Sequence, residues 1–268
     1  MNILNESNNC PIGFFDSGVG GLTVLARLKK LLPNEHYIFY GDNANVPYGD
    51  KSREQLLSYS NNILEYFKKR NCKAVVMACN TTSSTVYEDL KNKFQFKLYP
   101  VVQSVAKVIA KSDTKRLGVF ATKATIMSGA YEKEIKKFNP DMEIFSQYCP
   151  NWVKIVEDNI KNTPESIKII KSDLDKMMIN KPEKIVLGCT HYPYLIDVLS
   201  KFVPESIFID PAIPFSEYIY YDLKCANLLN NENKSPCEEF YVSATPEKFK
   251  EAAQMFYPIT KEPKLLTF

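Results

Sequence analysis

The sequence of 268 residues contains no long apolar run, no dense block of basic residues and no Cys-x-x-Cys pair. Because a membrane-spanning helix needs roughly 20 consecutive apolar residues, we expect no membrane segment. Lys and Arg number 34 and Asp and Glu number 31, so the net charge of +3 is nearly balanced. This balance, without a basic cluster, argues against nucleic acid or a membrane surface as the main partner.

The seven cysteines follow no regular spacing. Irregular spacing argues against a disulfide framework and favours a reducing compartment. The first residues, MNILNESNNCP, also lack the basic segment and apolar core of a secretion signal. We therefore expect a cytoplasmic protein.

Short apolar segments alternate along the chain with longer ones in which apolar residues recur near every 3.6 positions, as in residues 20–32 and 53–70. Apolar strands separated by helices are typical of parallel sheets covered on both faces, so the sequence predicts an α/β fold. The expected strands are residues 11–15, 36–41, 73–78, 97–101, 116–121, 142–148, 184–188, 206–210 and 239–243.

An internal repeat is visible in two pairs of segments. IGFFDSGVGGLTV, from Ile12, is similar in pattern to LGVFATKATIMSG, from Leu117, and KAVVMACNTTSS is similar to KIVLGCTHYP at nearly the same offset. Two pairs in the same order indicate two similar halves. We expect a first domain of residues 1–103 with 214–268 and a second of residues 104–213, with a polar surface loop at 230–236.

Chemically useful side chains follow four of the expected strands. In parallel α/β sheets, ligands bind beyond the carboxyl ends of the strands. A lone cysteine there is commonly a small buried side chain, Asp16 could simply cap a helix, and His191 could make a structural hydrogen bond. Two thiols at equivalent turns instead indicate joint function, because the N–H groups that follow can stabilise a thiolate. The groups are Asp16-Ser17, Cys79-Asn80-Thr81, Thr122 and Cys189-Thr190-His191.

Two thiols in equivalent half-sites suit a reaction that acts on two equivalent faces of one substrate carbon. A nucleophilic hydrolase needs only one activated cysteine and a base, and redox pairs are usually close in sequence. Cys79 and Cys189 on opposite sides of one carbon would invert its configuration, one removing a proton and the other returning it. Asp16 could assist Cys79, and His191 could hold or relay a proton beside Cys189. Donors already in place would stabilise the anion that develops.

Six segments resemble the glutamate racemases, of the cofactor-independent aspartate/glutamate racemase superfamily. They occur in the family's order over nearly the whole chain. They are FDSGVGGLTVL (15–25), VPYG (46–49), ACNT (78–81), GVFATKATIMSGAY (118–131), CPNWVKIVE (149–157) and GCTHYP (188–193). The chain departs from the family's usual residues at Asn45, Thr82 and Trp152.

The resemblance implies two flavodoxin-like domains related by pseudo-two-fold symmetry, with the active site between them. It also implies interconversion of L- and D-glutamate without a cofactor or metal, supplying D-glutamate for peptidoglycan. Cys79 would serve the D face and Cys189 the L face, with Asp16 supporting the first thiol and His191 and Glu157 near the second. The implied substrate contacts are Asp16, Ser17, Tyr48, Gly49, Asn80, Thr81, Thr122, Thr190 and His191.

Other functions stay open at this point. A racemase for aspartate or another acidic amino acid is one alternative, since about one methylene group in the pocket separates aspartate from glutamate. A difference of that size allows a pocket to discriminate between the two substrates by only roughly 1–3 kcal/mol. A zinc hydrolase could use Cys79, Cys189 and His191 as ligands, although no zinc spacing is present. Some relatives are associated with binding DNA gyrase, so a non-catalytic binding protein is a further alternative. Relatives often form dimers, which makes a homodimer possible.

Overall fold

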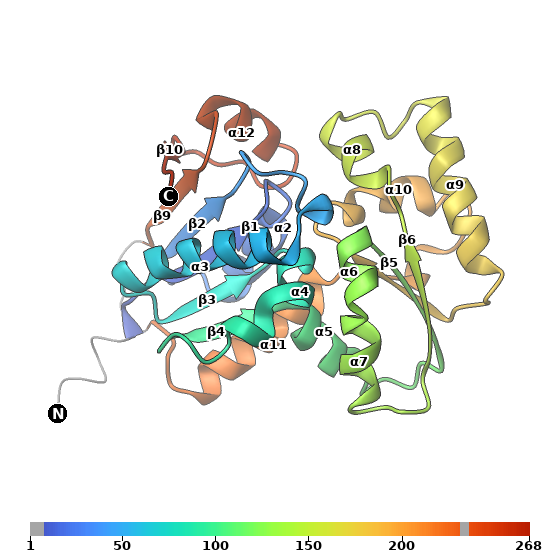
Figure 1. Cartoon of the computed structure of the whole chain (residues 1–268), viewed down its shortest axis with the longest axis horizontal. Coiled ribbons are helices and arrows are strands. Elements are labelled where there is room, and N and C mark those ends of the chain that lie inside the picture. The colour runs from blue at the N-terminus through green and yellow to red at the C-terminus, as the bar shows by residue number, and fades with distance from the viewer. Residues whose placement is uncertain (1–7, 231–235) are drawn as a thin grey trace.

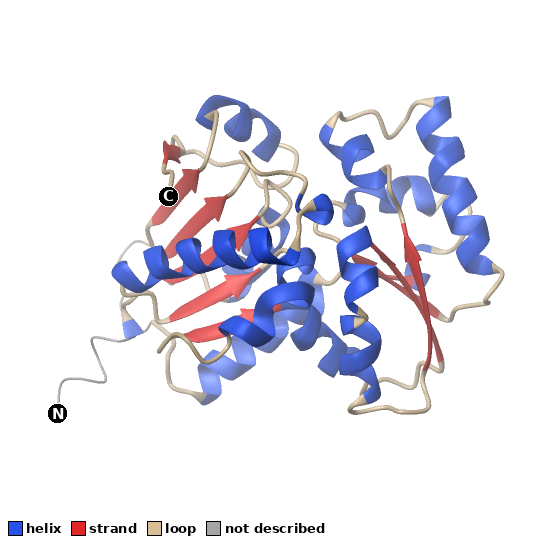
Figure 2. Ribbon diagram, viewed as in Figure 1, coloured by secondary structure: helices blue, strands red, loops and turns tan. Residues whose placement is uncertain are grey.

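The computed structural model describes residues 8–230 and 236–268, so most of the loop expected at 230–236 lies outside the described residues. Two parallel sheets stand side by side, each with helices on both faces (Figures 1 and 2). The predicted α/β class is confirmed. No helix within the described ranges is long and apolar enough to span a membrane.

The first sheet has the strand order β10-β9-β2-β1-β3-β4, and every neighbouring pair is parallel. Its strands are β1 (Ile12–Asp16), β2 (Tyr37–Gly41), β3 (Ala74–Met77), β4 (Lys97–Pro100), β9 (Glu238–Val242) and β10 (Lys264–Leu265). The second sheet has the order β6-β5-β7-β8, also parallel. Its strands are β5 (Arg116–Ala121), β6 (Glu143–Tyr148), β7 (Lys184–Gly188) and β8 (Phe208–Ile209).

The second sheet repeats the order of the β2-β1-β3-β4 part of the first. This order is that of flavodoxin-like sheets, and its recurrence supports the internal repeat seen in the sequence. All nine predicted strands are present, within a few residues of their expected ends. The short strand β10 was not predicted, because two exposed residues carry no apolar pattern.

Helices cover both faces of each sheet, because side chains alternate between the faces along every strand. In β1, Phe14 packs in the core on the side of α2, α5 and α11, whereas Phe15 packs with α3 and α4. In the second sheet α6 and α7 lie on one face and α8, α9 and α10 on the other (Figure 1). The α-helices are α2 (Leu22–Leu31), α3 (Arg53–Lys69), α4 (Asn80–Leu90), α5 (Val101–Ile109), α6 (Lys123–Ser128), α7 (Ala130–Lys136), α8 (Trp152–Glu157), α9 (Pro164–Met178), α10 (Ile196–Leu199), α11 (Ala212–Cys225) and α12 (Pro246–Ala253). The 3-10 helices are η1 (Tyr48–Asp50), η2 (Tyr192–Leu195) and η3 (Glu205–Ile207).

Local sequence explains where two of the helices begin. Ser52 and Gln55 form a capping box at the start of α3, each side chain bonding the other's backbone N–H. Helix α9 begins with Thr163, whose hydroxyl accepts a hydrogen bond from the N–H of Ser166, and with Pro164 in the first turn.

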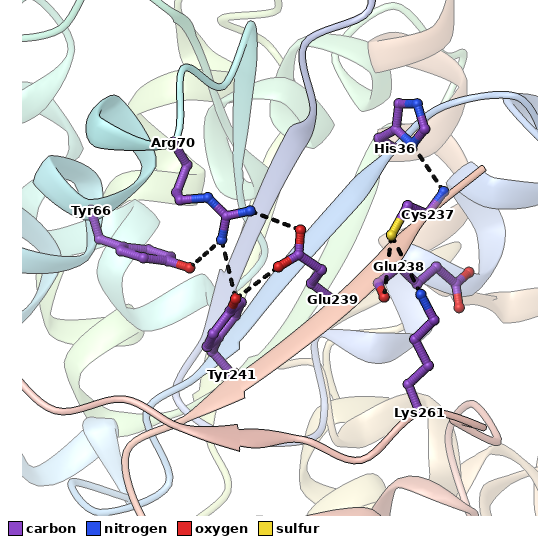
Figure 3. A network of polar contacts seen from close by, with 8 residues as sticks. All are labelled: His36, Tyr66, Arg70, Cys237, Glu238, Glu239, Tyr241 and Lys261. Atoms are coloured by element: carbon purple, nitrogen blue, oxygen red, sulfur yellow. Dashed lines mark hydrogen bonds and ion pairs between the residues drawn. The ribbon is translucent and has the colours of Figure 1, made fainter. Parts of the chain in front are cut away.

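The C-terminal part of the chain returns to the first sheet, where β9 pairs with β2. Figure 3 shows how polar contacts hold this strand: Arg70, at the end of α3, donates to Glu239 (2.7 Å), Tyr241 (3.2 Å) and Tyr66 (2.7 Å). The expected domain limits at 103/104 and 213/214 fall inside α5 and α11, which connect the two sheets. We keep the division into two domains at these positions as a proposal.

Candidate active site

A cavity of about 440 Å³ lies where the carboxyl ends of the two sheets face each other, a size typical of small-molecule sites. Segments from both halves of the chain line it. Eleven of the twelve predicted site residues are among the lining residues: Ser17, Tyr48, Gly49, Cys79, Asn80, Thr81, Thr122, Glu157, Cys189, Thr190 and His191. The twelfth, Asp16, is fully buried and does not line the cavity.

Cys79 lies between β3 and α4 and is the residue that precedes the first turn of the helix. Its sulfur is 4.0 Å from the Ser17 hydroxyl. Burial raises the pKa of the Cys79 thiol to about 12, and the nearby charge of Asp16 acts in the same direction. The N–H groups of Thr82 and Thr81 oppose the shift without cancelling it. With this pKa, Cys79 is a neutral thiol near pH 7 and is able to donate a proton.

Cys189 follows β7, but the element after it differs from the expectation of an equivalent helix. The chain continues into the four-residue 3-10 helix η2 and then the four-residue helix α10. Segments this short have a small dipole, so backbone stabilisation of a thiolate is weaker here than at Cys79. The positive charge beside Cys189 comes from His191 instead.

His191 connects Cys189 to a carboxylate. Its Nδ1 is 3.8 Å from the Cys189 sulfur, and its Nε2 is 3.1 Å from Glu157 Oε1, at the end of α8. Burial disfavours the charged imidazole, but hydrogen bonds to Cys189 and Glu157 outweigh burial and raise the pKa of His191 to about 10. The ring of Phe256 stands edge-on to the imidazole, with the centroids 5.9 Å apart.

Asp16, at the end of β1, joins the two halves of the site. Its Oδ2 accepts hydrogen bonds from the N–H of Gly21 (2.7 Å) and from the hydroxyl of Thr190 (3.2 Å). Among the described residues its Oδ1 has no hydrogen-bond partner. Burial raises the pKa of Asp16, while the charge of His191 and these hydrogen bonds lower it. The carboxyl group thus bonds the residue that precedes α2 and also holds the loop of the second cysteine, but it is not a side-chain cap of that helix, as the alternative reading would have required.

Two more hydrogen bonds connect the halves next to the cavity. The hydroxyl groups of Thr81 and Thr122 are 3.0 Å apart, and Thr122 also caps α6. The hydroxyl of Tyr131, on α7, donates to Asn80 Oδ1 over 2.8 Å. The first residues after β3 therefore hold the second half in place as well as lining the cavity.

The three departures from the family's usual residues have clear contacts. The Asn45 side chain donates to Asp42, which also accepts from the Tyr48 hydroxyl. The Thr82 hydroxyl donates to the carbonyl of Cys79 over 3.1 Å. Trp152 is fully buried against Phe120 and Tyr192, with centroids 4.8 and 4.9 Å away, and its indole N–H donates to Asp173.

Sequence reasoning did not identify two residues at the site. Tyr131 stands at the end of a segment that carries the resemblance, but its bond to Asn80 depends on two distant helices meeting. Phe256 follows α12 and carries no local signal, because only the fold brings it to His191. Within residues 8–230 and 236–268, no three His, Cys, Asp or Glu side chains are grouped as metal ligands.

The fold and the cavity define a two-domain α/β enzyme with a thiol from each half facing one small-molecule site. Residues 18–213 match the Asp/Glu/hydantoin racemase family. The chain belongs to this family.

Individual relatives are similar over nearly the whole chain. Glutamate racemase 2 of Caldanaerobacter subterraneus is 39% identical over 91% of this chain and 92% of that protein. The crystal structure of glutamate racemase from Francisella tularensis in complex with D-glutamate has a TM-score of 0.90 and 31% identity, and covers 97% of this chain and 98% of the other. The isoform RacE1 of Bacillus anthracis has a TM-score of 0.91 and 27% identity over the same shares. The flavodoxin-like fold with two similar halves is thus confirmed.

Proposed function

We propose that this chain is a glutamate racemase, which interconverts L- and D-glutamate with Cys79 and Cys189 as its two acid/base groups. The observation that carries the proposal is that both thiols, from equivalent turns of the two halves, line one cavity. The relatives named glutamate racemase and the similar structure with bound D-glutamate support glutamate as the substrate.

The two thiols have different surroundings, and these suggest their roles in the direction from L to D. Cys189 as thiolate would remove the Cα proton of L-glutamate, forming an S–H bond while the C–H electron pair moves into an enolate-like anion. The neutral Cys79 thiol would then give its proton to the opposite face of Cα, leaving Cys79 as thiolate. The reverse direction exchanges the roles, and no external proton is consumed.

The polar groups around the cavity would stabilise the anion that develops on the substrate carboxylate. The candidates are the hydroxyl and amide groups of Ser17, Asn80, Thr81, Thr122 and Thr190, together with the N–H groups that follow Cys79. They come from both halves, and the hydrogen bonds of Thr81 to Thr122 and of Thr190 to Asp16 already fix three of them, so little reorganisation is needed. His191, held by Glu157, would keep positive charge beside Cys189 and would exchange a proton with the Cys189 thiol.

The biological setting follows from the product. We propose that the enzyme supplies D-glutamate for peptidoglycan, since that is the use implied by the resemblance to the family. Six cysteines form no disulfide bond, namely Cys72, Cys79, Cys149, Cys189, Cys225 and Cys237, which supports a cytoplasmic location. The homodimer implied by the resemblance stays a proposal, to be measured by light scattering.

The test uses purified protein with no added cofactor. L-Glutamate in deuterated water should lose optical rotation and gain deuterium at Cα. Cys79→Ser and Cys189→Ser should each reduce turnover at least about 1,000-fold, because a serine hydroxyl is far less acidic than a thiol. Cys225→Ser, at an exposed free cysteine outside the cavity, is the matched control and should keep full activity.

Two further results would contradict the proposal. Retained racemisation in both active-site variants would refute the two-thiol mechanism, and strong inhibition by a chelator would restore the metal alternative. Faster turnover of aspartate than of glutamate in a substrate panel would change the assigned substrate but keep the mechanism.

A further inference from the structure

Tyr131 is a buried tyrosine that contacts residues next to both cysteines yet does not line the cavity. Its hydroxyl donates to Oδ1 of Asn80, the residue that follows Cys79. Its ring lies against Gly188, the residue that precedes Cys189: a Cβ atom at Gly188 would stand 3.1 Å from Tyr131 Cε2. One side chain therefore spans the distance between the two cysteine-bearing turns.

The local backbone explains how Tyr131 reaches this position. Gly129 has a φ of 62°, in the left-handed region that favours glycine, and it ends α6 and begins α7. This break turns the chain so that Tyr131, in the first turn of α7, is directed at α4. Apart from its chain neighbours, no heavy atom of the described residues lies within 4 Å of a Cβ built at Gly129, so the glycine is needed for its conformation and not for close packing.

The hydrogen bond from Tyr131 also decides the orientation of the Asn80 amide. Rotation of an asparagine amide by 180° has little intrinsic cost, so its surroundings choose between the two orientations. If Nδ2 faced Tyr131, the tyrosine hydroxyl would have to accept, and its own proton would have no acceptor within residues 8–230 and 236–268. A buried donor without an acceptor is costly, so the orientation with Oδ1 toward Tyr131 is favoured.

The opposite end of the Asn80 amide faces the cavity. Asn80 lines the cavity, and no described residue accepts a hydrogen bond from its Nδ2 group. Burial and the charge of Cys189 raise the pKa of Tyr131, which keeps the phenol neutral and able to donate. The N–H donors of Asn80 are thus free for an anionic ligand.

We propose that Tyr131 is a positioning residue of this enzyme: it orients the Asn80 amide so that Nδ2 donates to the substrate carboxylate, and it sets the spacing of the two cysteine turns. The proposal rests on the proposed racemase function. It adds a role for a side chain that touches neither the substrate nor the sulfur atoms.

The test compares Tyr131→Phe with a matched control. Tyr37→Phe also removes a buried hydroxyl, one that donates to the carbonyl of Leu32 over 2.7 Å, outside the cavity. We expect both variants to lose similar thermal stability. Only Tyr131→Phe should lower kcat/KM for glutamate, by about tenfold, the effect of one ordinary hydrogen bond, and mainly through a higher KM.

A double-variant cycle separates positioning from simple packing. In the Asn80→Ala background, adding Tyr131→Phe should cause no further loss of kcat/KM, because the amide that it orients is gone. Asn80→Ser replaces Asn80→Ala if circular dichroism shows that the latter does not fold. Losses that multiply, or a Tyr131→Phe enzyme as active as Tyr37→Phe, would overturn the proposal. The proposed function fails separately, and first, if the wild-type protein does not racemise glutamate.

Discussion

Gly20 allows the loop of the second cysteine to approach the start of α2. A Cβ atom built at Gly20 would lie 2.8 Å from Thr190 Cβ and 3.0 Å from His191 Nδ1. The backbone of Gly20 is not in the left-handed region, so alanine would add no conformational strain there. The change Gly20→Ala therefore acts on the site only through this contact.

The geometry gives the size of the effect. Ordinary contact begins near 3.4 Å, so Thr190 Cβ would have to move by about 0.6 Å from its 2.8 Å position, and the Thr190 hydroxyl oxygen, which lies nearer still, would have to move further. That movement would strain the 3.2 Å hydrogen bond from Thr190 to Asp16 and shift His191 relative to Cys189. Because misplacement by about 1 Å can cost 100-fold in rate, we expect a loss of about 10- to 100-fold in kcat/KM. This loss corresponds to about 1.4–2.7 kcal/mol of transition-state stabilisation.

Polarimetry of L-glutamate racemisation, paired with thermal unfolding, measures this effect. Gly118→Ala is the matched control, because its Cβ would meet Met177 Sδ at the same 2.8 Å but within the core of the second half. We expect both variants to lose stability and only Gly20→Ala to lose activity. A Gly20→Ala enzyme with wild-type kinetics would refute the idea that the placement of Thr190 and His191 limits catalysis.

Two predictions concern the surroundings of His191. Its pKa is raised from 6.5 to about 10, so its contribution to stability is complete below about pH 6.5 and is lost as the pH rises toward 10. Urea unfolding should show stability falling between pH 7 and 9.5 more steeply in the wild type than in His191→Gln, and parallel curves would contradict this assignment. Phe256→Leu removes the ring contacts with His191 and Tyr194, whose ring centroids lie 5.9 and 4.1 Å from that of Phe256. We expect this substitution to lower the free energy of unfolding by about 1 kcal/mol and to lower kcat. Unchanged unfolding and kinetics would show that Phe256 does not support the imidazole.

The sheets could be predicted because buried parallel strands are read as short apolar runs. Even β8, only two residues long, lies within the segment expected at 206–210. Periodicity gave no strand order, since order depends on which helices cross which face. The strand β10 and the 3-10 helix that follows Cys189 were not anticipated, because neither is marked by an apolar pattern.

The cysteine positions could be predicted from their place after strands, whereas their surroundings could not. Asp16 was expected near Cys79, yet its hydrogen bonds go to Gly21 and to Thr190, in the other half. That contact exists only once the two halves meet, so no local pattern carries it. The same holds for Tyr131, whose partner Asn80 lies on a different helix of the other half.

Equivalent turns in a duplicated fold do not give equivalent thiols, and the proposed reaction requires the difference. One thiol must hold a proton while the other lacks one, because two thiols would leave no base and two thiolates no acid. Burial and Asp16 keep the proton on Cys79, whereas Cys189 has the cationic His191 at 3.8 Å. One turnover from L to D reverses this arrangement and leaves a thiolate at Cys79, where the surroundings disfavour it. The enzyme must then return the proton to Cys79 before it can act on another molecule of L-glutamate.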